Sequence, residues 1–203
     1  MLGLPKSTEI TKQLPKKAIY TKFNMNTSAK DKFDSEISKI VIVNEISPTT
    51  TTLEEGNEVS SLFVLLVSLK KKEFSDNIIV QLSKLIPQNI LFILEFDGKC
   101  KLAVFRTKLI QSEWISSDKC TIQLNGLNID TVWENIIVQI GGIQIESGNT
   151  LDEQIAVYEQ RQKLQKEIDR LEKQARAEKQ PKKKFEIVQE INKLREDFMH
   201  YEN

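Results

Sequence analysis

The last quarter of the chain repeats its hydrophobic positions with a helical period on both sides of a proline. Apolar residues recur every three or four positions before and after Pro181, which has no backbone N–H and therefore interrupts the helical pattern. The first stripe comprises Val157, Leu164, Ile168, Leu171 and Ala175, and the second comprises Ile187, Ile191, Leu194, Phe198 and Tyr201. The short turn predicts an antiparallel, coiled-coil-like helical hairpin. A long two-chain coiled coil is disfavoured, because neither segment sustains three clean heptads.

The preceding part of the chain mixes strand-like and helix-like segments. Strands are predicted at residues 40–43, 59–69, 90–96, 101–105 and 120–124, and helices at 7–14, 29–38, 75–86 and 128–140. Asp97-Gly98 is a strong signal for a β-hairpin turn, and Gly141-Gly142 ends the predicted helix at 128–140. We therefore expect an α+β fold with a mixed or antiparallel sheet layered by helices. The predicted domains are a core at 1–147 and a hairpin arm at 148–203, which begins at Gly148.

Composition places few limits on the function. The 29 basic residues balance the 29 acidic ones, which argues against a protein built chiefly to coat nucleic acid. Cys100 and Cys120 have no metal-ligand spacing, so we expect both to be reduced and buried. The most apolar window, residues 62–69, is much shorter than a membrane span, and the N-terminus lacks the pattern of a signal peptide. These observations predict a cytoplasmic protein that does not enter a membrane.

The sequence offers little catalytic chemistry. The one histidine, His200, lies near the end of a charged helical segment, where a solvated position is expected. No Gly-rich phosphate loop is present, so we expect neither ATP chemistry nor a bound cofactor. A metal-dependent nuclease is one alternative, in which Glu95 and Asp97 hold Mg²⁺ and Lys99 orients water. Further carboxylates for such a site would come from Asp34, Glu36 or Glu45. The Asp-Gly turn and solvent exposure explain the same residues without a metal.

The turn of the predicted hairpin is cationic. Candidate contacts with a partner or with nucleic acid are Arg176, Lys179, Lys182, Lys183, Lys184, Phe185 and Tyr158. A run of lysines at a helix turn is often only solvated, whereas phosphate contacts and an acidic protein partner are the functional alternatives. Aromatic residues for base stacking are absent beyond Phe185, so the sequence does not support base-specific recognition. Trp114 and Trp133 are candidate interface anchors, although core packing is the commoner role at apolar spacing.

Several segments resemble a known family. They are residues 1–9, Pro48-Thr49-Thr50, Gly126-Leu127-Asn128 with Trp133-Glu134-Asn135, and above all residues 173–186 around the basic turn. In these segments the chain resembles the bacterial domain-of-unknown-function family four-three-nine-one. Members are often encoded beside an SNF2-like or DEAD/DEAH helicase and DNA methyltransferase or restriction subunits. The resemblance therefore implies a role in phage defence or restriction-modification, and it carries over no catalytic residue.

We therefore expect a non-enzymatic accessory protein that docks its helical hairpin on a helicase or methyltransferase partner. The first alternative is a nucleic-acid-binding subunit that uses the basic turn. The second alternative is the nuclease with Glu95, Asp97 and Lys99.

Overall fold

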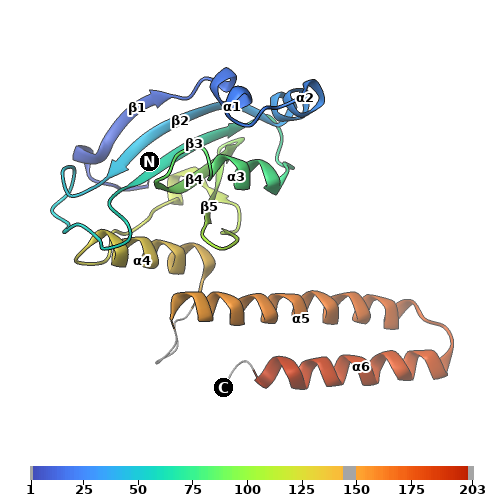
Figure 1. The fold of residues 1–203 in the computed structure, drawn as a ribbon. Helices are drawn as coiled ribbons and strands as arrows, with labels where there is room; N and C mark the ends of the chain where they lie inside the picture. The colour runs from blue at the N-terminus through green and yellow to red at the C-terminus, as the bar shows by residue number, and fades with distance from the viewer. Residues whose placement is uncertain (1, 144–149, 201–203) are drawn as a thin grey trace. The chain divides into compact units, whose positions relative to one another are not determined.

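The computed structural model describes residues 2–143 and 150–200, and side chains as far as residue 198. The chain divides into two compact units, residues 1–142 and 143–203. The domain boundary that the sequence predicted, between residues 147 and 148, lies outside the described residues. Figure 1 labels helices α1 to α6 and strands β1 to β5. None of the described helices combines the length and apolar character needed to cross a membrane.

The first unit is built on one sheet. Its strands are β1 (Glu9–Gln13), β2 (Ile37–Ile46), β3 (Leu62–Leu69), β4 (Asn89–Phe96), β5 (Lys99–Phe105), β6 (Leu109–Gln111) and β7 (Ile115–Ser116). They are ordered β1-β2-β3-β4-β5-β6, and β7 also pairs with β5. Every pair is antiparallel except β3 with β4, which run parallel. The predicted α+β fold with a mixed sheet layered by helices is therefore confirmed.

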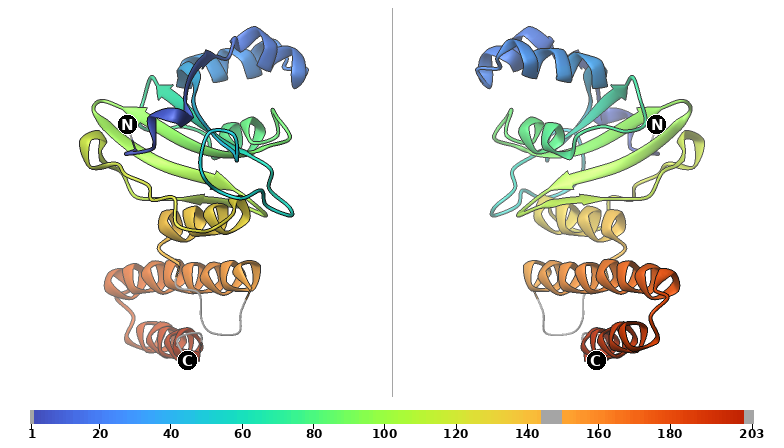
Figure 2. Two further views of the ribbon diagram at one scale, coloured as in Figure 1. Left: turned by 90° about the vertical axis from the view of Figure 1, so that its left-hand side faces the viewer. Right: turned by 90° about the vertical axis from the view of Figure 1, so that its right-hand side faces the viewer.

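Helices cover both faces of this sheet. They are α1 (Lys16–Lys22), α2 (Thr27–Glu36), α3 (Asp76–Leu82) and α4 (Ile129–Gly141), with short 3-10 turns at Lys6–Thr8 and Ser117–Lys119. The views in Figures 1 and 2 place α1, α2 and α3 on one side of the sheet and α4 on the other. Both faces of the central strands are thus removed from water, which explains the continuous apolar sequence of β3 and β4.

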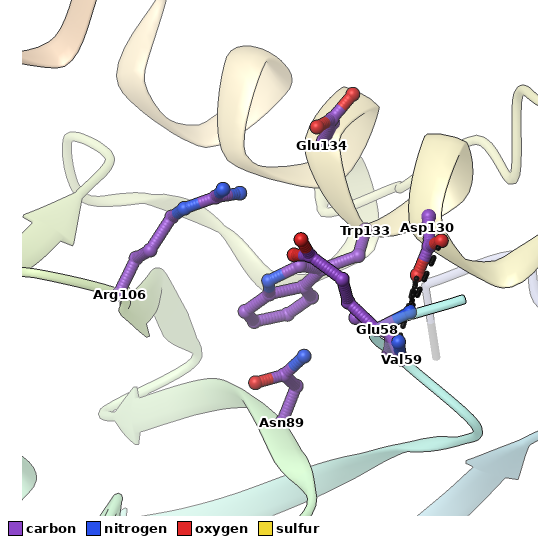
Figure 3. A pocket seen from close by; sticks show the side chains of 7 residues that line it. All are labelled: Glu58, Val59, Asn89, Arg106, Asp130, Trp133 and Glu134. Carbon is purple, nitrogen blue, oxygen red and sulfur yellow. Dashed lines mark hydrogen bonds between the residues drawn. The ribbon is translucent and has the colours of Figure 1, made fainter. Parts of the chain in front are cut away.

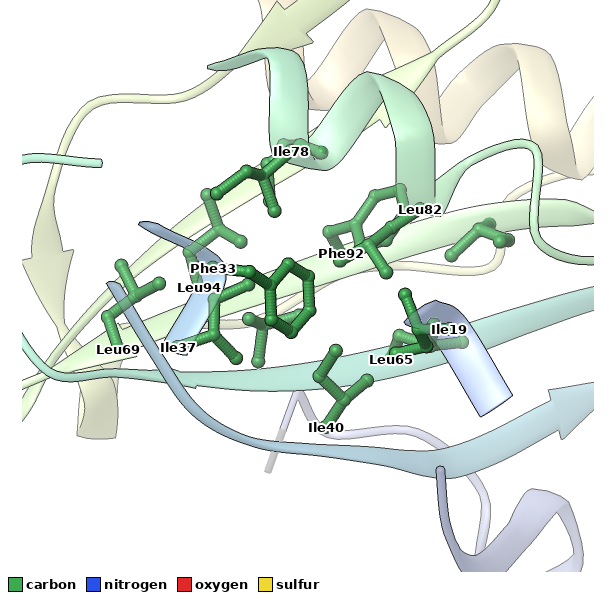
Figure 4. Close-up of a cluster of buried hydrophobic side chains, with 14 of the residues drawn as sticks. Ile19, Phe33, Ile37, Ile40, Leu65, Leu69, Ile78, Leu82, Phe92 and Leu94 are labelled. Atoms are coloured by element: carbon green, nitrogen blue, oxygen red, sulfur yellow. The ribbon is translucent and has the colours of Figure 1, made fainter. Parts of the chain in front are cut away.

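The main hydrophobic core lies under the first three helices (Figure 4). Phe33 of α2 and Leu82 of α3 meet Phe92 of β4 within one buried cluster. Along β4, Ile90, Phe92 and Leu94 belong to this cluster, and Leu91 between them is equally buried on the opposite face. Trp133 of α4 is buried and Trp114 packs against the main cluster, so both tryptophans contribute to the core of this unit.

Two element predictions are wrong. Residues 7–14 were expected to form a helix, but after the first 3-10 turn they form β1, which pairs with β2. Ile10 and Leu14 pack against the main core from this strand. Residues 120–124 make only a single bridge, from Thr121 to Leu2, instead of a strand. Their backbone is held by Gln139 of α4, whose amide bonds both the N–H and the carbonyl of Gln123 at 3.0 and 2.9 Å.

The segment before β3 is held by a carboxylate of α4. Asp130 accepts hydrogen bonds from the backbone N–H groups of Asn57 at 2.6 Å, Val59 at 2.7 Å and Glu58 at 3.2 Å. The approach is close, because a Cβ on Gly56 would lie 2.3 Å from an Asp130 oxygen. Residues 59–61, which the sequence assigned to the strand, are therefore part of this tethered loop, and β3 starts at Leu62.

We predict that Asp130→Ala destabilises the first unit by about 2 kcal/mol, because three backbone donors lose a charged acceptor. The measurement is the midpoint of urea unfolding followed by tryptophan fluorescence. Glu55→Ala is the matched control, since Glu55 is an exposed acid of the same loop. Equal midpoints for the two variants would contradict the proposed tether.

Candidate functional site

The second unit is the predicted helical hairpin. It consists of α5 (Leu151–Ala177) and α6 (Pro181–His200), joined by residues 178–180. The two helices pack through Ile168, Leu171, Ala175 and Ile191, with Ile187 and Leu194 at the edges of this seam. These residues belong to the two predicted stripes, and the antiparallel hairpin is confirmed. Tyr201 and the side chain of His200 lie outside the described residues.

Charged side chains connect the helices beside the seam. Glu172 of α5 binds Arg195 of α6 at 2.7 Å and Arg176 of its own helix at 3.1 Å. Exposed ion pairs of this kind contribute little, up to about 1 kcal/mol each. They matter more for the candidate contacts at the turn. Because Arg176 is already paired with Glu172, it is a weaker candidate than the lysines for contact with a partner.

Pro181 follows the turn between the two helices and is the first residue of α6. A proline suits this position, because the first helical N–H has no partner inside the helix. The carboxylate of Glu178 accepts the backbone N–H of Gln180 at 2.8 Å and stabilises the turn. By contrast, α5 begins with a complete capping box between Thr150 and Glu153.

The first turn of α6 carries only positive charge. Lys182, Lys183 and Lys184 follow Pro181, and this turn contains no acidic residue. Lysines at a helix N-terminus face the positive end of the helix macrodipole and are unfavourable by about 0.3–1 kcal/mol each. Among the described residues, their ammonium groups and that of Lys179 have no ion-pair or hydrogen-bond partner. Hairpin stability therefore does not explain these lysines.

Two exposed apolar side chains lie next to the lysines. Phe185 is 62% exposed and Val188 is 38% exposed, and their spacing of three residues places them on one face of α6. We call Lys179, Lys182, Lys183, Lys184, Phe185 and Val188 the tip surface. The sequence placed Val188 outside the seam but did not select it as a site residue. Tyr158 is not part of this surface, because it lies roughly 28 Å along α5 from the turn, at 1.5 Å per residue.

The residues of the nuclease alternative do not converge. Asp97 and Gly98 form a tight turn with positive φ values of 48° and 69°, which confirms the predicted hairpin. In its register Phe96 pairs with Lys99 and Glu95 pairs with Cys100, so Glu95 and Lys99 project from opposite faces of the sheet. Asp34 is engaged elsewhere, by Lys16 and Tyr20 at 2.6 Å each. Within the described part of the chain, no three His, Cys, Asp or Glu residues are grouped to hold a metal ion.

The two cysteines are free and buried, as predicted. Burial, followed by the neighbouring Cys120 thiol, raises the pKa of Cys100 to about 12. Burial likewise raises the pKa of Cys120. Both side chains are therefore neutral thiols at physiological pH, and neither is activated as a nucleophile.

Comparison with known proteins identifies the family of the chain. A family model described as Domain of unknown function (DUF4391) matches residues 2–198. The chain therefore belongs to this family of domains of unknown function, as its sequence resemblance indicated. No curated protein and no solved structure matches the chain.

We predict that replacing Lys182, Lys183 and Lys184 with Glu leaves the hairpin folded and slightly raises its thermal stability. The reason is that three negative side chains near the positive end of the α6 macrodipole would stabilise the helix, whereas the lysines destabilise it. Circular dichroism should show unchanged helix content. The matched control replaces three other exposed lysines, Lys163, Lys166 and Lys193, with Glu. A loss of helix only in the tip variant would mean that the tip lysines have a structural role.

We also predict that the folded protein reacts slowly with a thiol reagent at pH 8 and that both cysteines react after denaturation. Stability should decrease as the pH rises above 9.0, the ordinary thiol pKa. Above this pH the unfolded chain releases thiol protons that the folded chain retains, because its pKa values are higher. Rapid labelling of the folded chain would contradict the buried, neutral assignment.

Proposed function

We propose that this protein is a non-enzymatic interaction protein of a bacterial phage-defence or restriction-modification system, and that its tip surface docks on a larger helicase or methyltransferase. One observation carries the proposal. Phe185 and Val188 are exposed beside four lysines that have no partner among the described residues, on a hairpin whose own seam is already filled by other residues.

The composition of the tip surface fits a protein partner. Energetically important interface positions are enriched in aromatic residues surrounded by polar neighbours that exclude water. Phe185 supplies the large apolar contact, and the lysines around it would face an acidic patch of the partner. Such rim charges mainly accelerate association, whereas the buried apolar contact determines the lifetime of the complex.

Nucleic acid is the second candidate ligand, favoured by the unpaired lysines. Ammonium groups at the end of an arm can contact phosphates of any sequence, and an exposed phenylalanine can stack on an unpaired base. One aromatic residue and a net charge of zero make this a weaker fit than a protein surface. The nuclease is not proposed, because Glu95 and Lys99 lie on opposite faces of their hairpin.

The decisive experiment is co-purification of the tagged full chain with the products of its neighbouring genes, among which the proposal requires a helicase or a methyltransferase. We predict that the double variant Phe185→Ser, Val188→Ser weakens the complex by about tenfold or more, because the apolar contact is lost. The triple lysine-to-glutamate variant should mainly slow association, and more so at low salt. The control is Gln189→Ser with Asn192→Ser, at exposed polar positions of the same helix.

Two outcomes would reject docking through the tip surface. The first is a complex that the Phe185 and Val188 variant leaves unchanged. The second is tight DNA binding by the chain alone that is lost in the triple lysine variant. In that case the slope of log K against log salt should fall by up to about three, roughly one for each lost phosphate contact.

A further inference from the structure

One end of the first unit carries a basic surface that has no role in the proposed docking function. Helices α1 and α2 form it together with the chain that follows β3 (Figure 1). The sheet holds these segments together, because Ile37 at the start of β2 pairs with Leu69 at the end of β3. The N–H of Lys70 also donates to the carbonyl of Glu36, the last residue of α2, at 2.8 Å. We call residues 16–36 and 70–73 the α1–α2 surface.

Three lysines of this surface are arranged around one carboxylate. Lys16 and Tyr20 each donate a hydrogen bond to Asp34 at 2.6 Å. The ammonium group of Lys30 lies over the ring of Tyr20, 5.9 Å from its centroid. The hydrogen bonds from Lys16 and Tyr20, with the nearby charges of Lys16 and Lys70, lower the pKa of Asp34. One carboxylate neutralises only one of the three ammonium groups, so the cluster keeps a net positive charge.

Positive charge is in excess over the whole α1–α2 surface. Its residues include eight lysines and four acidic residues. Two of the four acids are already paired with lysines of the same surface, Asp34 at 2.6 Å and Glu36 at 3.7 Å. Six lysines therefore remain against two acidic residues.

The larger part of the first unit has the opposite charge. Residues 41–69 and 74–142 contain eleven acidic residues and six basic ones. Three of these acids, Glu58, Asp130 and Glu134, line a single cavity beside α4 (Figure 3). A surface that serves only solubility intersperses both signs, whereas separated charge is typical of a protein that meets a charged partner. The neutral total charge of the chain therefore conceals a positive surface.

The neighbouring side chains indicate which anionic partner fits. Asn24, Thr27 and Ser28 are exposed between the lysines of α1 and those of α2. Amide and hydroxyl side chains of this kind accompany lysines at the phosphates of nucleic acids. The large hydrophobic side chains that are exposed in the described chain are Ile115, Leu127, Phe185 and Val188. None of them belongs to the α1–α2 surface, although membrane insertion or the centre of a protein interface would require such residues.

We propose that the α1–α2 surface binds the phosphodiester backbone of a double-stranded nucleic acid without reading its sequence. The lysines pair with phosphates, and the exposed amide and hydroxyl groups add neutral hydrogen bonds. A single strand is a poorer fit, because it needs exposed aromatic rings for stacking, and both Tyr20 and Phe23 pack against the main core. This contact lies in the first unit and is independent of the tip surface.

The experiment measures binding of the full chain to fluorescently labelled duplex DNA and duplex RNA by anisotropy at several salt concentrations. At least one duplex should bind with an affinity that is independent of its sequence and decreases as salt rises. The variant Lys30→Gln, Lys70→Gln, Lys72→Gln should lower this affinity about tenfold or more. It should also reduce the slope of log K against log salt by up to about three, roughly one for each lost contact. Arginine at the same three positions should retain binding.

The matched control is Lys6→Gln, Lys99→Gln, Lys119→Gln, which removes the same charge from exposed lysines of the first unit outside the surface. Equal losses in the two glutamine variants, or no binding of either duplex by the natural sequence, would overturn the proposal. Salt-sensitive binding only to phosphatidylglycerol vesicles, or only to a second copy of the chain, would also overturn it.

The lysine-to-glutamate variant of the tip separates this proposal from the docking proposal. It should leave binding of the duplex unchanged, because Lys182, Lys183 and Lys184 belong to the second unit. Duplex binding that is lost in the tip variant and kept in the α1–α2 variant would overturn the assignment. Docking on the protein partner is measured separately by co-purification, so either proposal can fail without the other.

Discussion

The parallel pairing of β3 with β4 is the constraint from which the architecture of the first unit follows. Two consecutive strands can run parallel only if the chain crosses back over the sheet between them, and α3 lies in this crossover. The crossover covers one face of the central strands with Ile79 and Leu82, both fully buried. The opposite face then needs its own cover, which α4 supplies.

The hairpin follows a different balance of forces. Its seam is short and apolar, and the ion pairs of Glu172 lie at its exposed margin. The lysines at the start of α6 are repelled by the positive end of its helix macrodipole. At the start of α5, by contrast, Thr150 and Glu153 form a capping box, and the acidic side chain is favourable at that end of the helix. The start of α5 thus carries residues that stabilise a helix N-terminus, whereas the start of α6 carries residues that destabilise it. Departures of this kind are expected where a surface serves binding.

The site residues could be predicted from the sequence only in part. The lysines were identified because they form a run of positive charge at the turn around Pro181, and Phe185 because it is an aromatic residue beside the second stripe. Tyr158 was selected for its chemistry alone, and the length of α5 separates it from the turn. A polar cavity that reaches from Glu58 to Trp133 was not predicted, because its lining residues come from four segments that are distant in the chain.

The sequence by itself determined the features that depend on short-range interactions. These include the Asp97-Gly98 turn, the start of α4 at its Asn128 cap and the periodic seam of the hairpin. Tertiary structure decided whether residues 9–13 became a strand, because β2 offered an open edge and the core accepted Ile10. It also decided that residues 59–61 join a loop held by Asp130. These outcomes depend on partners far away in the chain, and only the folded chain brings those partners into contact.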